Sequence, residues 1–227
     1  MEPVNNQHNF PVGISDFKKI RENDYYYIDK SGLIKELLKR ESAEVTLITR
    51  PRRFGKTMGM SMLAHFLIYG PITGGYSMVL KLSTIQVGQS LHTMSTALKD
   101  NTALRFAVIT GCLKIAKESI FTGTNNFVSD NITDSRFNEY FGFTQEEVDQ
   151  ILTDANVSGK AEEVKRWYDG YHFGRFDVYC PWDVMNYMRD LQQNPEAAPA
   201  SRKRNKNKKM QVTVSYITVT CIFLFIA

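Results

Sequence analysis

One segment in the first quarter of the chain limits the fold more than any other. Residues 45–57 read Val-Thr-Leu-Ile-Thr-Arg-Pro-Arg-Arg-Phe-Gly-Lys-Thr. The apolar start predicts a buried strand, the middle predicts a tight loop, and the residues after it predict a helix. A strand, a loop ending in Gly-Lys-Thr and a helix, in that order, are typical of a phosphate-binding loop. The segment therefore predicts an α/β fold and a nucleoside triphosphate ligand.

The loop residues fit separate roles in phosphate binding. Backbone N–H groups and the N-terminal end of the following helix surround the phosphates in such loops. Lys56 fits the lysine that reaches the β- and γ-phosphates, Thr57 fits the hydroxyl that binds Mg²⁺, and Gly55 permits a close backbone approach. Arg50 stands where the general pattern has its first glycine. The alternative is an ordinary basic turn on the surface.

Hydrolysis also requires a carboxylate at the end of a neighbouring strand. Residues 58–99 contain no Asp and no Glu. The apolar run 104–110 predicts a buried strand, but Asp100 precedes this strand instead of ending it. Asp130 and Asp134 come later and follow no predicted strand. The sequence therefore predicts a phosphate site without a catalytic carboxylate, and it leaves the catalytic residues unassigned.

The rest of the chain predicts further elements. At 227 residues and 43% hydrophobic content, it can form one sizeable α/β domain and a small subdomain. A short strand is predicted at 25–28, followed by a helix capped by Ser31. The later elements are a helix behind a capping box at 144–147, a helix at 161–168, a hairpin at 171–179 and a helix from Pro181.

The charge is concentrated near the C-terminus. Six of the 28 basic residues lie between 202 and 209, so residues 1–201 carry 22 basic against 24 acidic residues. The folded part therefore gives no support to nucleic acid as a partner. Residues 212–227 carry no charge, and we expect a sticky or disordered tail. They are fewer than the roughly 20 residues that span a bilayer, so we expect no membrane association, although a tail anchor is an alternative. Three scattered cysteines indicate a reducing, cytoplasmic setting.

Six ordered segments together resemble the bacterial AAA-ATPase-like family: Pro11–Phe17, Tyr27–Ser31, Thr49–Thr57, Phe106–Gly111, Trp167–Tyr171 and Pro181–Val184. In that family the loop reads R-P-R-R-F-G-K-T, so Arg50 follows the family pattern. The resemblance implies ATP and Mg²⁺ as cofactors and a following nuclease-like domain of the PD-(D/E)xK type. It also implies a Walker-B strand ending in Asp-Glu before residue 104, which this sequence lacks. We expect an internal deletion around 67–93 and a shifted or truncated end.

The loop and the resemblance together predict the nucleotide contacts: Arg52, Arg53, Phe54, Gly55, Lys56, Thr57 and Thr110, with Mg²⁺ at Thr57. Thr110 is either a sensor-like contact near the γ-phosphate or a turn residue at the strand end. Arg52 and Arg53 face phosphate, face a neighbouring subunit, or are surface charges. An aromatic group near the hairpin, which includes Trp167 and Trp182, is expected to be core.

We therefore predict an α/β fold, a three-layer P-loop NTPase core with an incomplete sheet and a small helical or winged-helix lid. The expected divisions are 1–135 for the core, 136–194 for the lid and 195–227 for linker, basic run and apolar tail. The predicted function is ATP binding with impaired hydrolysis, with a homo-oligomer or a protein partner as further expectations. The alternative is a regulatory or interaction remnant without nucleotide affinity, with membrane association through the tail.

Overall fold

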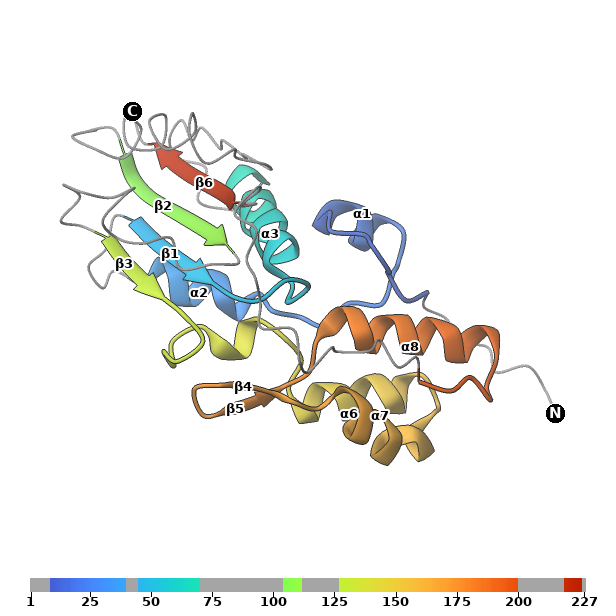
Figure 1. Ribbon diagram of the computed structural model, residues 1–227. Helices are drawn as coiled ribbons and strands as arrows, with labels where there is room; N and C mark the ends of the chain where they lie inside the picture. The colour runs from blue at the N-terminus through green and yellow to red at the C-terminus, as the bar shows by residue number, and fades with distance from the viewer. Residues whose placement is uncertain (1–8, 40–44, 70–103, 112–126, 200–218, 226–227) are drawn as a thin grey trace.

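A four-stranded sheet forms one end of the molecule (Figure 1). The computed structural model describes residues 9–39, 45–69, 104–111, 127–199 and 219–225. The strands lie in the order β3 (Phe127–Asp130), β1 (Val45–Thr49), β2 (Leu104–Gly111) and β6 (Val219–Phe225). β1 is parallel to β2 and to β3, whereas β6 is antiparallel to β2. The predicted strands at 45–49 and 104–110 are confirmed, and the three parallel strands with helices make a mixed α/β fold.

The sheet is buried on both faces. Ile48 and Val108 point to one face, where they pack with apolar residues of α2 (Gly32–Leu38) and α3 (Lys56–Tyr69). Leu47 and Ile109 alternate to the opposite face and are fully buried as well. The helices α2 and α3 therefore supply one layer beside the sheet. The predicted third layer stays a prediction, because the segments 70–103 and 112–126 lie outside the described residues.

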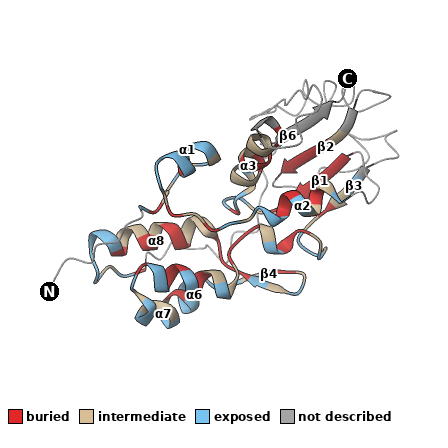
Figure 2. Cartoon of the chain, turned by 180° about the vertical axis from the view of Figure 1, so that it is seen from behind, coloured by how far each residue is buried: buried red, intermediate tan, exposed pale blue. Residues whose placement is uncertain are grey.

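Helices and a hairpin form the other end of the molecule (Figures 1 and 2). Its elements are η1 (Asn138–Tyr140), α6 (Gln145–Asp154), η2 (Ser158–Lys160), α7 (Ala161–Tyr168), β4 (Tyr171–Phe173), β5 (Phe176–Val178) and α8 (Pro181–Gln193). Thr144 and Glu147 make the predicted capping box of α6, and Pro181 opens α8 as predicted. The predicted helices and hairpin are thus confirmed.

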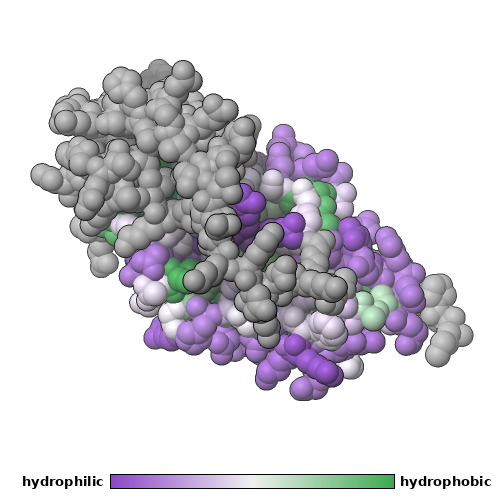
Figure 3. All heavy atoms as spheres, in the orientation of Figure 1, coloured by the Kyte–Doolittle hydropathy of each residue, from purple (hydrophilic) through white to green (hydrophobic). Residues whose placement is uncertain are grey.

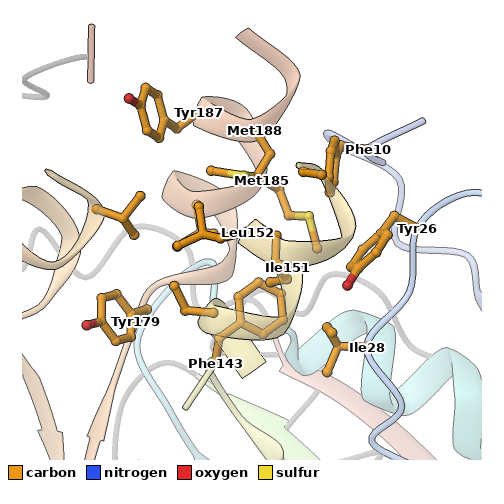
Figure 4. Close-up of a cluster of buried hydrophobic side chains, with 14 of the residues drawn as sticks. Phe10, Tyr26, Ile28, Phe143, Ile151, Leu152, Tyr179, Met185, Tyr187 and Met188 are labelled. Atoms are coloured by element: carbon orange, nitrogen blue, oxygen red, sulfur yellow. The ribbon is translucent and has the colours of Figure 1, made fainter. Parts of the chain in front are cut away.

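The N-terminal segment packs into this helical end. Phe10, Tyr26 and Ile28 are buried among apolar residues of α6 and α8 (Figure 4). The predicted strand at 25–28 is wrong, because Tyr25 makes just an isolated bridge with Asn9. Within this segment lies α1 (Phe17–Glu22), whose N-cap is Asp16, and the Asp16 carboxylate accepts a hydrogen bond from the Lys19 N–H.

Ser31 does not cap α2 with its side chain, which corrects a second prediction. Its hydroxyl instead donates to Asp29 at 3.1 Å, and its N–H donates to the same carboxylate at 2.8 Å. Asp29 therefore makes the turn before α2, as aspartate commonly does by bonding the backbone two residues ahead.

Part of the C-terminal tail belongs to the sheet. β6 pairs with the full length of β2, with Ile222 opposite Val108 and Thr220 opposite Thr110. We expected residues 195–227 to lie outside the fold, and β6 differs from that expectation. The physical reason is that the outer edge of β2 offers unpaired backbone groups, which a β-branched apolar segment can satisfy. The basic run 202–209 lies outside the described residues.

The exposed surface of the described part is mainly polar. The view in Figure 3 shows hydrophilic residues over most of the described surface, with small hydrophobic patches. Val128, Ile132 and Trp167 are exposed large hydrophobic side chains. Trp167 and His172 are exposed, while Phe173 is buried, so the predicted aromatic core near the hairpin is divided between core and surface. Among the described residues, no helix is both long enough and apolar enough to cross a membrane.

We predict that β6 stabilises the sheet through its backbone pairing with β2. Proline lacks the N–H that a ladder requires, so Cys221→Pro and Ile222→Pro should lower the thermal unfolding midpoint by several degrees and promote aggregation. Neighbouring N–H groups on an edge strand alternate in direction, so one of the two must remove a bond to β2. Ile222→Val is the matched control. Unchanged midpoints in both proline variants would contradict the pairing.

Candidate functional site

The loop between β1 and α3, where a phosphate-binding loop is predicted, has two residues with left-handed backbone. Gly55 has a φ of +77° and Arg53 a φ of +72°, so the chain turns sharply just before α3 begins at Lys56. A Cβ built on Gly55 would meet no atom within 4 Å, so the space in front of this residue is open. The strained φ at Arg53, a non-glycine residue, is a feature that recurs at functional sites.

The Lys56 ammonium lies back over its own loop. Its Nζ donates to the carbonyl oxygens of Arg50 at 3.0 Å and Pro51 at 2.6 Å. Thr57, the next residue, is exposed in the first turn of α3. A phosphate ligand placed at the N-terminal end of α3 would meet this ammonium, the hydroxyl and the helix N–H groups together.

A cavity of about 330 Å³ opens beside the loop. Its lining comes mainly from stretches distant in sequence, which are 11–15, 26–28, 53–59, 140–143 and the start of α8. Most of these side chains are apolar, and Lys56 and Thr57 add the polar end. A mainly apolar cavity with cationic side chains in its lining suits a ligand that has an aromatic ring and a phosphate chain.

The predicted contact residues divide into two groups. Residues 53–57 line the cavity, whereas Arg52 and Thr110 lie outside its lining. Thr110 is 2% exposed on the sheet, and Arg52 is exposed to solvent. The Phe54 side chain is fully buried, so this residue offers the cavity chiefly its backbone. Sensor-like and subunit-facing roles for Thr110 and Arg52 stay predictions.

Phe54 anchors the loop to the hairpin. Its ring lies 4.6 Å from that of Tyr171 in an edge-on arrangement and 5.0 Å from that of Phe173. Gly142, with a φ of +103°, passes so close that an added Cβ would lie 3.3 Å from Phe54 and 3.1 Å from Val178. A side chain at position 142 would thus be strained and crowded, and the glycine permits the loop and hairpin to touch.

The buried thiol of Cys180 adds a hydrogen bond between the helical part and the same loop. Cys180 Sγ donates to the Arg53 carbonyl oxygen at 3.8 Å. Burial raises the pKa of this thiol to about 12, with the nearby Asp183 carboxylate adding to the effect. Cys180 therefore stays protonated at neutral pH and keeps its donor, which is the state that this contact needs.

Arg50 is the most deeply buried charged residue of the loop region. Its side chain is 0% exposed, and one terminal nitrogen donates to Asp130 Oδ1 at 2.5 Å and to Asn138 Oδ1 at 2.7 Å. The other terminal nitrogen donates to the Thr49 carbonyl oxygen at 2.9 Å. The guanidinium also lies over the ring of Phe141, 5.4 Å from its centre. Arg50 thus ties the end of β1 to the end of β3 and to η1.

The prediction that Asp130 follows no strand is wrong. It ends β3, a strand that pairs directly with β1, so a carboxylate does stand at the end of a neighbouring strand. β3 has four residues and is just partly apolar, which is why its sequence gave no strand signal. However, Asp130 is 3% exposed and its Oδ1 is bonded to Arg50. The carboxylate is therefore engaged inside the fold.

Burial and pairing act in opposite directions on these two groups. Burial raises the pKa of the Asp130 carboxyl and lowers the pKa of the Arg50 guanidinium, and the ion pair opposes both effects. An arginine side chain does not deprotonate in proteins, so its charge remains and requires an anionic partner. Asp130 is thus held as the counter-ion of Arg50.

Lys30 is a second cation beside the cavity, and it is half-buried. Its Nζ lies 2.5 Å from Glu147 Oε1 and donates to the Glu139 carbonyl oxygen at 2.6 Å. Burial lowers the pKa of this ammonium, and Glu147 opposes the effect. Because Glu147 also closes the capping box of α6, Lys30 joins the N-terminal segment to that helix.

The residues near Thr57 suit an Mg²⁺ ion that takes most of its oxygen ligands from a bound phosphate compound and from water. Among the described residues, no group of three or more His, Cys, Asp or Glu is placed to hold a metal ion. Mg²⁺ commonly takes one or two protein oxygens and completes its shell with phosphates and water. The exposed Thr57 hydroxyl beside the Lys56 ammonium would supply such an oxygen.

Sequence reasoning missed most of the cavity wall. The segments 11–15, 27–30 and 181–182 were noted as family motifs without a role, and they meet the loop at one cavity. Their similarity to family motifs is the signal that could have marked them, although nothing in a single sequence shows that they lie together. Met185 and Asn186 of α8 carried no signal of their own.

Comparisons with known proteins find a family match for the N-terminal part of the chain and a distant relative. Residues 11–70 match the family model described as "Predicted AAA-ATPase". This match confirms the resemblance to the AAA-ATPase-like family over those residues. No solved structure matches the chain.

A relative in Azotobacter chroococcum mcd 1, an uncharacterized protein in the vnfD 5′ region, is 25% identical over 264 residues. The matched region covers 77% of this chain and 51% of that protein, so the chain spans about half of its relative's length. Since 264 exceeds the 227 residues of this chain, the relative has positions without a counterpart here.

We predict that Asp130→Asn lowers the free energy of unfolding by about 3–5 kcal/mol, because it leaves the Arg50 charge buried without an anion. Urea unfolding measures the change. The control is Asp169→Asn, an exposed carboxylate, which should change stability by about 0.5 kcal/mol or less.

A second variant keeps this prediction testable if Asp130→Asn does not fold. Replacing both partners, with Arg50→Met and Asp130→Leu, removes the uncompensated charge and should recover much of the lost stability. A double variant no more stable than Asp130→Asn would contradict the pairing.

Proposed function

We propose that this chain binds ATP with Mg²⁺ at the loop between β1 and α3. The observation that carries the proposal is the Lys56 ammonium, held by two loop carbonyls at the N-terminal end of α3 and facing a cavity with an apolar wall. The phosphates would replace those carbonyls as acceptors, with the Thr57 hydroxyl on Mg²⁺. The family match over residues 11–70 supports the same ligand.

The cavity gives the base a place. An adenine ring has two apolar faces and polar edges, and the cavity combines apolar residues such as Val12 and Met185 with polar groups such as Asn186. The phosphate chain would point from this wall toward Lys56. The N-terminal segment and α8 would therefore hold the base, while the loop holds the phosphates.

We infer that bound ATP is hydrolysed poorly. The acid at the end of the strand next to β1, Asp130, already serves as the counter-ion of buried Arg50. The acid-free interval 58–99 holds no substitute, and the unmatched positions of the relative are consistent with a lost segment. At 3% exposure and paired with Arg50, this carboxylate is poorly placed to orient an attacking water.

Three further expectations concern the cellular setting, the assembly of the chain and the lid. The buried free thiol of Cys180 is consistent with a reducing, cytoplasmic setting. A homo-oligomer or a protein partner would follow the family resemblance. The helical part fits the predicted lid because residues 140–143 and the start of α8 contribute to the cavity lining.

Binding of a fluorescent ATP analogue tests the proposal. We expect saturable binding that strengthens with Mg²⁺ and that weakens about ten- to a hundredfold in Lys56→Ala, since a charge-assisted hydrogen bond contributes roughly 1.5–3 kcal/mol. Lys18→Ala, on exposed α1, is the charge-matched control and should bind as the parent does.

The alternative of a remnant without nucleotide affinity predicts a different result. In that case the folded parent would show no saturable binding, or Lys56→Ala and Lys18→Ala would bind equally. Either outcome would reject the nucleotide site.

A further inference from the structure

The Arg53 guanidinium stacks on an indole of the helical part. Its central carbon lies 4.8 Å from the centre of the Trp182 ring, at the start of α8. Both residues line the cavity beside Lys56. Arg53 itself is exposed, so its charge is accessible to a ligand in that cavity.

The backbone of Arg53 is fixed independently of its side chain. Its φ of +72° is left-handed, the Cys180 thiol donates to its carbonyl oxygen, and the next residue, Phe54, is fully buried against the hairpin. Such a backbone fixes where the side chain starts, and the side chain extends to the cavity and to Trp182 of α8. The contact with Trp182 then selects the orientation of the guanidinium plane.

A stacked guanidinium keeps its donors. An arginine presents its flat face to an aromatic ring, while its N–H groups lie in the plane and point outward. The same geometry that satisfies Trp182 thus leaves the edge of Arg53 available to a phosphate oxygen. Trp182 in turn reaches the N-terminal segment, since a Cβ built on Gly13 would lie 4.0 Å from its Cη2 atom.

We propose that Trp182 is a positioning residue that holds the Arg53 guanidinium edge-on to the phosphates of the bound nucleotide. Because Trp182 lies on α8, phosphate binding at the loop and the position of α8 influence each other through this contact. The inference rests on the proposed ATP site, and it assigns to α8 a part in phosphate binding that the loop motif does not contain.

Trp182 can report the contact directly. The chain has two tryptophans, and the other, Trp167, is 46% exposed on α7. In a Trp167→Phe background, emission comes from Trp182 alone. Arg53→Met should shift this emission without any ligand. Arg175→Met is the matched control, because Arg175 is also exposed and stacks on a different ring, Phe176, at 5.2 Å; it should leave the emission unchanged.

Binding measurements then test the positioning role. Equilibrium dialysis with MgATP should show Arg53→Met and Trp182→Leu each weakening binding about tenfold, and the double variant no weaker than Arg53→Met. Trp182→Tyr keeps an aromatic face and should retain most of the affinity. In the single-tryptophan background, MgATP should change Trp182 emission, and this change should vanish in Arg53→Met.

The outcomes separate this inference from the proposed function. If dialysis shows ATP binding but Trp182 emission does not respond, or if the two affinity losses multiply, the positioning role is wrong and the ATP site stands. Unaltered emission of ligand-free Arg53→Met also overturns it. If dialysis shows no binding by the folded parent, the ATP site fails and the positioning role with it.

Discussion

The buried guanidinium of Arg50 joins parts of the chain that lie far apart in sequence. It bonds Asp130 at the end of β3 and Asn138 in η1, and it lies over the ring of Phe141. The carbonyl of Arg50 accepts a bond from the Lys56 ammonium. One side chain therefore fixes the end of β1, its neighbour β3 and the start of the loop. The guanidinium thus commits the nearby Asp130 carboxylate to a structural bond, while the backbone carbonyl of the same residue is one of two acceptors of the Lys56 ammonium.

The loop is held from a second side by the helical part. Phe54 packs into the hairpin and Cys180 bonds the Arg53 carbonyl oxygen, so the cradle lies between the sheet and the lid-like elements. The cavity forms at this junction, and its wall comes from segments that are remote in sequence. A site built in this way depends on packing between both ends of the molecule. Movement of α8 relative to the sheet would change the shape of the cavity.

Local pattern was sufficient for much of the fold. The strands at 45–49 and 104–111, the capping box at Thr144 and the proline start of α8 follow from apolar runs and end signals. Lys56 and its loop were likewise readable, because the motif is contiguous. These features depend on neighbouring residues, which is the information that one sequence holds.

Features that depend on contacts between residues far apart in sequence could not be predicted from the sequence. β3 is a strand because it lies beside β1, and β6 is a strand because the edge of β2 accepts it. The family pattern accounts for Arg50 in the loop, but its bonds to Asp130 and Asn138 become visible only in the fold. The cavity wall likewise needs the three-dimensional meeting of residues 11–15 with α8. In each case the decisive contact spans a large sequence separation.

The central claim is that this fold retains the nucleotide cradle while Asp130 is engaged by Arg50 and unavailable for catalysis. Phosphate release from MgATP, measured for the parent and for Lys56→Ala under conditions where the parent is saturated, tests this claim most directly. The account predicts the same background rate for both proteins, despite ATP binding by the parent. The account would be contradicted if the parent hydrolysed ATP at a rate that is lost in Lys56→Ala and is also lower in a folded Asp130→Asn variant.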